Sequence, residues 1–261
     1  LRQSTGAGFK DCNSAIQEAK GDLEKAVEIL RVKGISKASK KMTRDANEGV
    51  IAVSGNSEKL SIIEVNCETD FVAKNDGFVA LANELAEIAL KNNSLDEFLN
   101  SEIDSMTVAE KLVQQTGVIG EKLVIGGFET LSAAYVGKYI HAGNKIATLS
   151  GFSISSDGIE DVAKNVAMQA AAMNPIALDE SGVDQSTIDK EIEIAKDQLR
   201  QEGKPEAMLD NIAKGKLKRF FKDNTLVNQD FIKNSKQSVA AYVKSNNSDL
   251  KITGFKRVAL V

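Results

Sequence analysis

Residues 60–75 read LSIIEVNCETDFVAKN. The first six of these residues are mostly apolar and rich in β-branched side chains, which predicts a strand. The chain then turns at residues 67–75, and a helix is expected to begin near Phe78. At that turn the carboxylate of Asp70 stands beside the ring of Phe71, and both are expected to be presented at an edge. Such a pair suits insertion into another protein better than it suits catalysis.

The pattern of strand, turn, strand, loop and helix occurs twice in the chain. Residues 50–53, VIAV, form a strand that precedes the one described above, and the turn-rich residues 54–57 join the two. At an offset of about 85 residues, strand-like runs at 132–140 and 144–152 are followed by helical spacing over 159–173. This repetition predicts an α+β fold with a duplicated core, in which helices cover one side of each antiparallel sheet.

Helical segments flank and interrupt this core. Residues 1–40 carry capping residues and apolar helical spacing, with Gly34 expected to end the last helix, and they predict a small three-helix unit. The basic residues 36–47 are expected to form a linker with partial helicity. Narrow apolar seams over 184–202 and 206–222 predict an antiparallel helical hairpin that stands away from the core.

The remaining elements are predicted by the same rules. Helical spacing predicts a helix over residues 108–116 and a short one over 238–244. A strand pair is expected over 121–129, and a closing strand over 250–261.

Composition restricts the class of protein. The formal net charge of −4 over 261 residues argues against broad binding to a nucleic-acid backbone. No run approaches about 20 apolar residues and no signal peptide is visible, so no membrane association and a cytoplasmic location are expected. Cys12 and Cys67 lie far apart and outside zinc-binding spacing, so we expect them to be buried free thiols.

Nothing in the sequence indicates an active site. His141 is the only histidine, and no nucleophile–base pair or set of metal ligands is evident. Residues 5–8, TGAG, lack the GK[ST] ending of a phosphate-binding loop and are interpreted as a tight turn. We therefore expect no catalytic residue, no metal and no cofactor, and we do not expect an enzyme.

Several short motifs occur along the chain in a fixed order. They are Leu1-Arg2 with TGAG at 5–8 and Asp11-Cys12, CETDFVAKN at 67–75, Ile119-Gly120-Glu121, His141 with Gly143, Ala167-Met168, and Gly215-Lys216-Leu217-Lys218. Together these motifs resemble those of the elongation factor Ts family, the bacterial and organellar nucleotide-exchange factors for elongation factor Tu. The resemblance covers essentially the whole chain. Two signatures in order and at compatible spacing are more specific than either one alone.

The sequence patterns and this resemblance divide the chain into four units. They are an N-terminal three-helix (UBA-like) domain at 1–43, a core N-subdomain at 44–130, a core C-subdomain at 131–178 and 223–261, and a helical-hairpin (coiled-coil) insertion at 179–222.

The resemblance also implies a function. A factor of this family binds its GTPase and wedges open the nucleotide site, and Thr69, Asp70, Phe71 and Val72 would form the wedge. Phe71 would enter an apolar pocket between helices of the partner. Asp70 would compete for polar contacts near the region that organises Mg²⁺. The implied partner is elongation factor Tu, in its GDP-bound and nucleotide-free states, which would release GDP and rebind GTP.

The resemblance implies five further contacts with this partner, namely Arg2, Phe9, Ile119, Gly120 and His141. Arg2 would pair with an acidic residue of the partner's nucleotide domain. Ile119 and Gly120 would pack beside the wedge, and His141 would lie near the same partner helix. Taken alone, a histidine between a strand and a glycine is more often structural. Phe9 departs from the family pattern, which often has Met there.

Two other interpretations stay open. A ribosome- or RNA-associated binding module would use the basic stretches 37–44 and 214–219, although the acidic net charge and the lack of tryptophan argue against base-stacking surfaces. An enzyme is disfavoured by the lack of paired catalytic groups.

Overall fold

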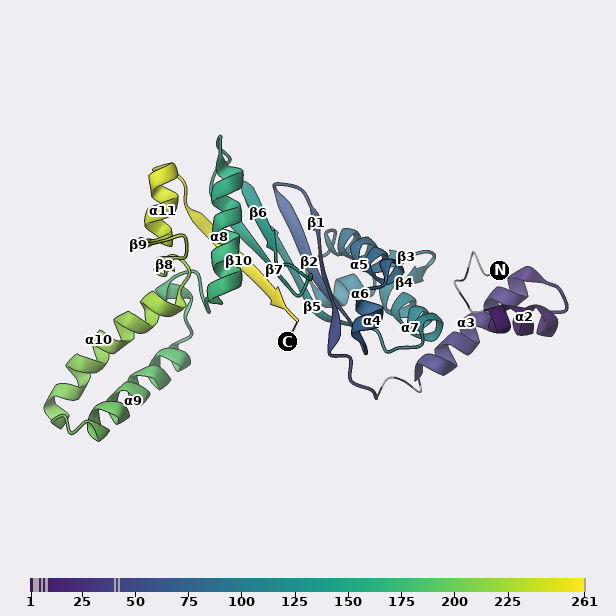
Figure 1. Ribbon diagram of the computed structural model, residues 1–261, viewed down its shortest axis with the longest axis horizontal. Helices are drawn as coiled ribbons and strands as arrows, with labels where there is room; N and C mark the ends of the chain where they lie inside the picture. Colours follow the sequence, from purple (N-terminus) through teal and green to yellow (C-terminus); the bar gives the residue numbers. More distant parts are fainter. Residues whose placement is uncertain (2–4, 6, 8, 40, 42, 261) are drawn as a thin grey trace.

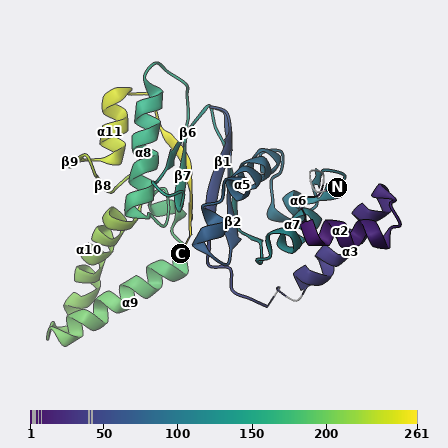
Figure 2. The same cartoon turned by 45° about the vertical axis from the view of Figure 1, so that its right-hand side comes forward.

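The computed structural model describes residues 1, 5, 7, 9–39, 41 and 43–260. Two sheets lie at the centre of an elongated molecule (Figure 1). The helices at one end are α2 (Phe9–Glu18) and α3 (Leu23–Ser39), and a hairpin of α9 (Gln185–Gln201) and α10 (Glu206–Asn224) projects at the other. Figure 2, turned by 45°, shows the same separation of the two helical ends.

Each central sheet has three antiparallel strands. The first contains β1 (Glu48–Gly55), β2 (Lys59–Cys67) and β5 (Val124–Ser132) in the order β1-β2-β5, and the second contains β6 (Tyr135–Ile140), β7 (Ile146–Phe152) and β10 (Ile252–Ala259) in the order β10-β7-β6. In both sheets a hairpin supplies one edge and the central strand, and a later strand closes the other edge. The predicted α+β duplication is therefore confirmed in the topology.

The two sheets pack face to face, and helices cover their outer faces. Helix α5 (Asp76–Ala89) covers the first sheet and α8 (Ile159–Met173) covers the second (Figure 1). Ile62 of β2 packs with Leu149 between the sheets, whereas its neighbour Ile63 packs into the cluster beneath α5. Alternate residues of a strand point to opposite faces, so β2 is buried on both sides. This double burial explains the apolar run in residues 60–65.

Helices α2 and α3 pack around a small core made mostly of alanine, with Ala15, Ala19 and Ala26 buried. The third helix of the predicted unit, together with Arg2, lies outside the described residues. The linker prediction is correct in part, because α3 reaches Ser39 and residues 43–47 carry no helix or strand.

The prediction that Gly34 ends its helix is wrong, because α3 continues through it to Ser39. Gly34 lies where α3 crosses α7 (Val108–Ile119), and a Cβ placed on Gly117 of α7 would stand 2.6 Å from the Gly34 Cα. Two glycines thus allow the two helix backbones to touch. Gly34 serves a close helix crossing here and not a helix end.

The predicted helical hairpin is confirmed. Its seam buries Leu199 of α9 against Leu209 and Ala213 of α10. Ion pairs link the two helices, from Lys196 to Asp210 at 3.0 Å and from Arg200 to Glu206 at 2.9 Å. The connecting turn contains Gly203 with φ of 73°, a conformation that favours glycine.

Shorter elements complete the fold. They are α4 (Asp70–Ala73), α6 (Leu95–Leu99), β3 (Glu102–Ile103), β4 (Met106–Thr107), a 3₁₀ turn η1 (Glu180–Gly182), β8 (Asp230–Phe231), β9 (Asn234–Ser238) and α11 (Val239–Asn246). The strand pair predicted over 121–129 is wrong, because residues 120–123 form the turn after α7 and a single strand, β5, follows. Across the described part of the chain, no helix combines the length and the apolar character needed to span a membrane.

Candidate partner-binding site

The segment after β2 forms a short helix, α4, rather than the open turn expected from the sequence. Thr69 has an extended backbone and caps this helix, because its hydroxyl accepts the Val72 N–H at 3.4 Å. Asn75 caps α5 directly afterwards. Threonine and asparagine are favoured N-caps, and an acidic residue follows each of them in the first helical turn. Asp70 and Phe71 therefore stand on a helical turn with a defined backbone.

Both side chains of this pair are accessible to a partner. Phe71 is 82% exposed, whereas Phe78 on α5 is 1% exposed. The Lys74 ammonium donates to the Asp70 carboxylate at 2.7 Å, and this bond and its charge lower the pKa of Asp70 from its ordinary value. Asp70 is thus ionised at neutral pH, next to an unpacked ring.

Ile119 and Gly120 lie beside this pair. Phe71, Val72 and Ile119 line the same depression on the surface. Gly120 ends α7 in the left-handed conformation, with φ of 88°, and donates its N–H to the Thr116 carbonyl at 3.0 Å. The structure therefore brings the expected wedge residues together with two of the five further contact residues.

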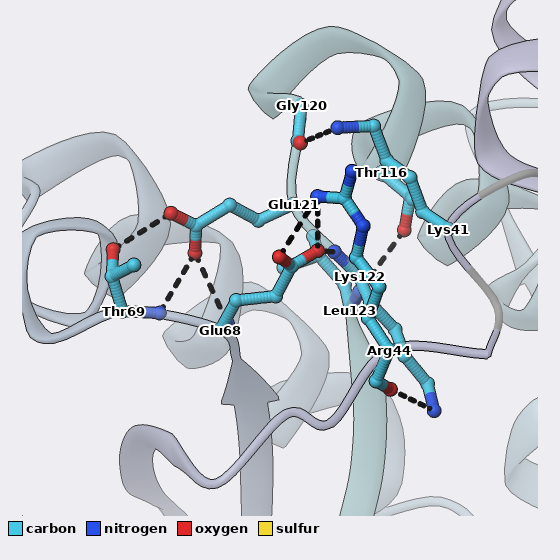
Figure 3. Close-up of polar contacts among 9 residues, drawn as sticks. All are labelled: Lys41, Arg44, Glu68, Thr69, Thr116, Gly120, Glu121, Lys122 and Leu123. Atoms are coloured by element: carbon cyan, nitrogen blue, oxygen red, sulfur yellow. Dashed lines mark hydrogen bonds and ion pairs between the residues drawn. The ribbon is translucent and has the colours of Figure 1, made fainter.

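The carboxylate of Glu121 holds the start of α4. Its Oε2 accepts the backbone N–H groups of Glu68 and Thr69, each at 3.0 Å, and its Oε1 accepts the Thr69 hydroxyl at 2.7 Å (Figure 3). In return, Glu68 Oε1 accepts the N–H of Lys122 at 2.7 Å. Two loops that are 53 residues apart in sequence are thus joined by reciprocal bonds from carboxylate to backbone.

The segment between α3 and β1 joins the same network. Arg44 pairs with the Glu68 carboxylate at 3.0 Å, Lys122 Nζ donates to the Arg44 carbonyl at 2.9 Å, and Lys41 Nζ contacts the Gly120 carbonyl (Figure 3). Burial alone would raise the pKa of Glu68, but the Lys122 N–H and the Arg44 guanidinium outweigh it and lower that pKa. Lys41 and Arg44 are therefore internal contacts of the fold.

His141 is exposed at the turn between β6 and β7. Its Nδ1 lies 3.0 Å from the Tyr139 hydroxyl, and Asn144 in the same turn accepts the Ile51 N–H at 2.8 Å. Lys145, just after this turn, pairs with Glu48 at 2.9 Å, and Glu48 lies opposite Cys67 at the end of β2 that leads into α4. The His141 turn therefore lies at the same end of the sheets as α4.

The N-terminal contact residues belong to a different part of the molecule. Phe9 begins α2 and is 73% exposed. Arg2 lies outside the described residues. Exposed apolar side chains also occur on α3, at Leu23, Val27 and Val32, and none of them was among the contact residues predicted from the sequence.

The chemistry of this region does not point to catalysis. The Cys67 thiol is fully buried and donates to the Thr69 carbonyl at 3.2 Å. Burial raises its pKa to about 11, and the neighbouring Glu121 carboxylate adds to the shift. A protonated, inaccessible thiol is a poor nucleophile. Within the described ranges, no three His, Cys, Asp or Glu side chains are grouped so as to hold a metal ion.

Sequence reasoning did not identify the role of Glu121, although this residue stands in one of the motifs. Its partners, Glu68 and Thr69, are more than fifty positions away, and no local pattern links them. The only signal available was a carboxylate directly after a glycine that could end a helix.

Comparisons with known proteins agree on one family. The family model described as "Elongation factor TS" matches residues 68–261. A protein named "Elongation factor Ts" from Christiangramia forsetii is 61% identical, with 100% of this chain and 96% of the relative covered. Proteins of the same name are 59% identical in Flavobacterium psychrophilum, with 100% and 96% covered, and 40% identical in Porphyromonas gingivalis, with 100% and 95% covered.

Proposed function

The chain belongs to the elongation factor Ts family of translation elongation factors, and from this premise we propose that it is a guanine-nucleotide exchange factor for elongation factor Tu. In this proposal it binds the GDP-loaded GTPase, disturbs the Mg²⁺ and phosphate site, and promotes GDP release so that GTP can rebind. The observation that carries the proposal is the exposed Phe71 ring beside ionised Asp70, on a turn whose base is held by Glu121.

The proposed action needs no covalent chemistry from this chain. Phe71 enters an apolar pocket of the partner, while Asp70 competes for polar groups that organise the bound Mg²⁺. A bound Mg²⁺ neutralises much of the phosphate charge and orders the switch segments of a GTPase. Its displacement breaks coordination bonds to the metal and weakens nucleotide binding, but no covalent bond is made or broken. Thr69 and Val72 contribute by forming the backbone of the wedge.

Thermodynamic linkage limits what the wedge can do alone. GDP must weaken binding of the factor by the same ratio by which the factor weakens binding of GDP. Burial of a phenylalanine side chain is worth roughly 1.5–3 kcal/mol, or about one to two decades in an equilibrium constant. Other contacts with the partner must therefore supply the rest of the binding free energy that weakens GDP binding.

The additional contacts in this proposal come from two surfaces. Ile119 lines the depression beside the wedge and Gly120 follows it in the chain, and His141 is exposed at the same end of the sheets. Phe9, and Arg2 by family resemblance, would extend the interface to the N-terminal helices.

An RNA-binding module has less support. Several basic side chains of the two stretches that it would use have acidic or carbonyl partners within the chain: Lys41 with Gly120, Arg44 with Glu68, Lys216 with Glu202 and Arg219 with Asp223. Cations engaged in this way are less available to phosphates, and the net charge of the chain is −4.

The test is a nucleotide-release assay. Elongation factor Tu is loaded with a fluorescent GDP, unlabelled GDP is added in excess, and release is followed with and without this protein. We expect faster release with the protein present. Release at the unassisted rate would refute the exchange function. The RNA-binding alternative is tested by titrating a labelled structured RNA with the protein at two salt concentrations. That alternative requires binding that weakens as the salt concentration rises.

A further inference from the structure

The direction of the Phe71 ring depends on the backbone that carries it. The ring is 82% exposed, so packing within this chain does little to orient it. Helix α4 has only 4 residues, and helices this short are not stable on their own. The contacts of α4 with the rest of the fold therefore determine where Phe71 points. Val72 and Ala73 pack against the core at its end, and hydrogen bonds hold its start.

Glu121 provides the anchor at the start of α4. Its two carboxylate oxygens accept three bonds, from the N–H groups of Glu68 and Thr69 and from the Thr69 hydroxyl. That hydroxyl in turn accepts the Val72 N–H at 3.4 Å, which closes the helical turn. The chain of bonds runs from Glu121 through Thr69 to the residue that follows Phe71.

Glu121 is itself held on both sides. Before it, Gly120 ends α7 in the left-handed conformation and donates to the Thr116 carbonyl. After it, Lys122 donates to Glu68 at 2.7 Å, and Leu123 donates to the Thr116 hydroxyl at 3.0 Å, where Thr116 is 1% exposed. The backbone of this turn is therefore fixed, and the three bonds that the carboxylate accepts hold the Glu121 side chain toward the start of α4.

We propose that Glu121 is a positioning residue, which sets the direction of Phe71 by holding the backbone of Glu68 and Thr69. This inference rests on the proposed exchange function and deepens it. Glu121 acts through α4, and its effect on nucleotide release passes through Phe71.

The test is a double-mutant cycle in the release assay, with wild type, Glu121→Ala, Phe71→Ala and the double variant. Loss of bonds to a charged acceptor is expected to slow assisted release by about tenfold in the Glu121→Ala protein. In the Phe71→Ala background the same change should alter release by less than about twofold, because the ring that Glu121 positions is already gone. Equal slowing in both backgrounds would show a role independent of Phe71 and overturn the proposal, as would unaltered release by Glu121→Ala.

Glu97→Ala is the matched control. Its carboxylate also accepts a backbone N–H, from Asn93 at 2.9 Å, but it lies on α6 and outside the network around α4. This variant should release nucleotide at the wild-type rate. Glu121→Gln keeps a carbonyl acceptor for the two N–H groups, and it is expected to recover most of the activity. If Glu121→Ala does not fold, Glu121→Asp takes its place in the cycle, because its shorter side chain keeps the charge but loses the reach to Glu68 and Thr69.

Amide hydrogen exchange on the free protein separates this inference from the exchange function. The Thr69 and Val72 amides should exchange faster in Glu121→Ala than in wild type, and unchanged protection would overturn the positioning role. If wild type fails to accelerate GDP release, the proposed function is wrong, whereas amide exchange still decides whether Glu121 holds α4.

Discussion

At the scale of single residues, two phenylalanines close in sequence have opposite surroundings. Phe71 on α4 is 82% exposed, and Phe78 on α5 is 1% exposed within the core of the first sheet. Exposing a large apolar ring to water has a free-energy cost. Phe71 lies beside an ionised carboxylate and lines a surface depression, and this combination indicates a site where a partner protein binds. The two residues offer a matched pair of substitutions.

Phe71→Ala is expected to slow assisted GDP release by about one to two decades, because roughly 1.5–3 kcal/mol of burial in the partner is lost. Its melting temperature should stay close to that of wild type, since the ring is not packed. Phe78→Ala should instead lose about 3–5 kcal/mol of folding free energy. Release kinetics and thermal unfolding measure both effects. A stability loss for Phe71→Ala as large as that for Phe78→Ala would place Phe71 in the core and remove its role as a wedge.

At the scale of secondary-structure elements, regular patterns were predictable and long-range contacts were not. The two hairpins, α8 and the hairpin α9–α10 follow from the periods of their apolar residues. Helix α4 was missed because one helical turn has no period, although Thr69 and Asp70 carry its capping signal. Gly34 was misread because a glycine at a helix end and a glycine at a helix crossing look alike without the partner, Gly117. The Glu121 bonds were missed for the same reason, since their partners lie far away in sequence.

The crossing of α3 and α7 provides a prediction at this scale. In Gly117→Ala the new methyl group would stand 2.6 Å from the Gly34 Cα and 2.8 Å from its carbonyl oxygen, so a backbone must move. We expect a loss of about 1–3 kcal/mol in folding free energy and faster proteolytic cleavage in residues 40–47. Thermal unfolding and limited proteolysis provide the measurements.

Gly215→Ala is the control for that crossing. Gly215 lies within α10, and a Cβ there would have no neighbour within 4 Å. Alanine in a helix interior is favoured over glycine by roughly 0.5–1 kcal/mol, so this variant should be slightly more stable than wild type. Equal stability of the two alanine variants would mean that α3 and α7 do not touch at this point in solution.

At the scale of the whole molecule, the two ends have different cores. The N-terminal helices bury mostly alanine, whereas the sheets and their helices bury large side chains such as Phe78, Phe98 and Phe152. Stabilisation grows with the apolar area that is removed from water. The N-terminal unit is therefore expected to unfold at lower denaturant than the rest, as suits our proposed division of the chain near residue 43.

The two cysteines report on these parts separately. Cys12 is buried in the N-terminal unit and Cys67 in β2. Cys12 is studied in the Cys67→Ala variant, and Cys67 is studied in the Cys12→Ser variant. Each protein is treated with a thiol reagent at pH 8 and increasing urea. We expect Cys12 to become reactive at a lower urea concentration than Cys67. Simultaneous exposure would show a single cooperative unit and contradict the division.

The reactivity of Cys67 in the folded protein, before any urea is added, also depends on pH. Burial raises the pKa of the folded Cys67 thiol to about 11, so the fold favours the protonated form. The stability that the fold gains by keeping this thiol protonated is fully present below the ordinary thiol pKa. It is lost as the pH rises through about 11. Native Cys67 should therefore stay unreactive at pH 8, and reaction there without denaturant would contradict its burial.

The order of strands also affects how the chain folds during synthesis. All three strands of the first sheet are complete once residue 132 has been made, but the second sheet must wait for β10, which follows the entire hairpin α9–α10. Val258 of β10 completes the layer between the sheets, which includes Leu60 and Ile62 of β2. On the ribosome, β6 and β7 can therefore cover the inner face of the first sheet early, whereas the last strand of this layer is made late. At typical synthesis rates of about 5–20 residues per second, the edge of β7 that β10 will pair with stays open to chaperones and to aggregation for several seconds or more.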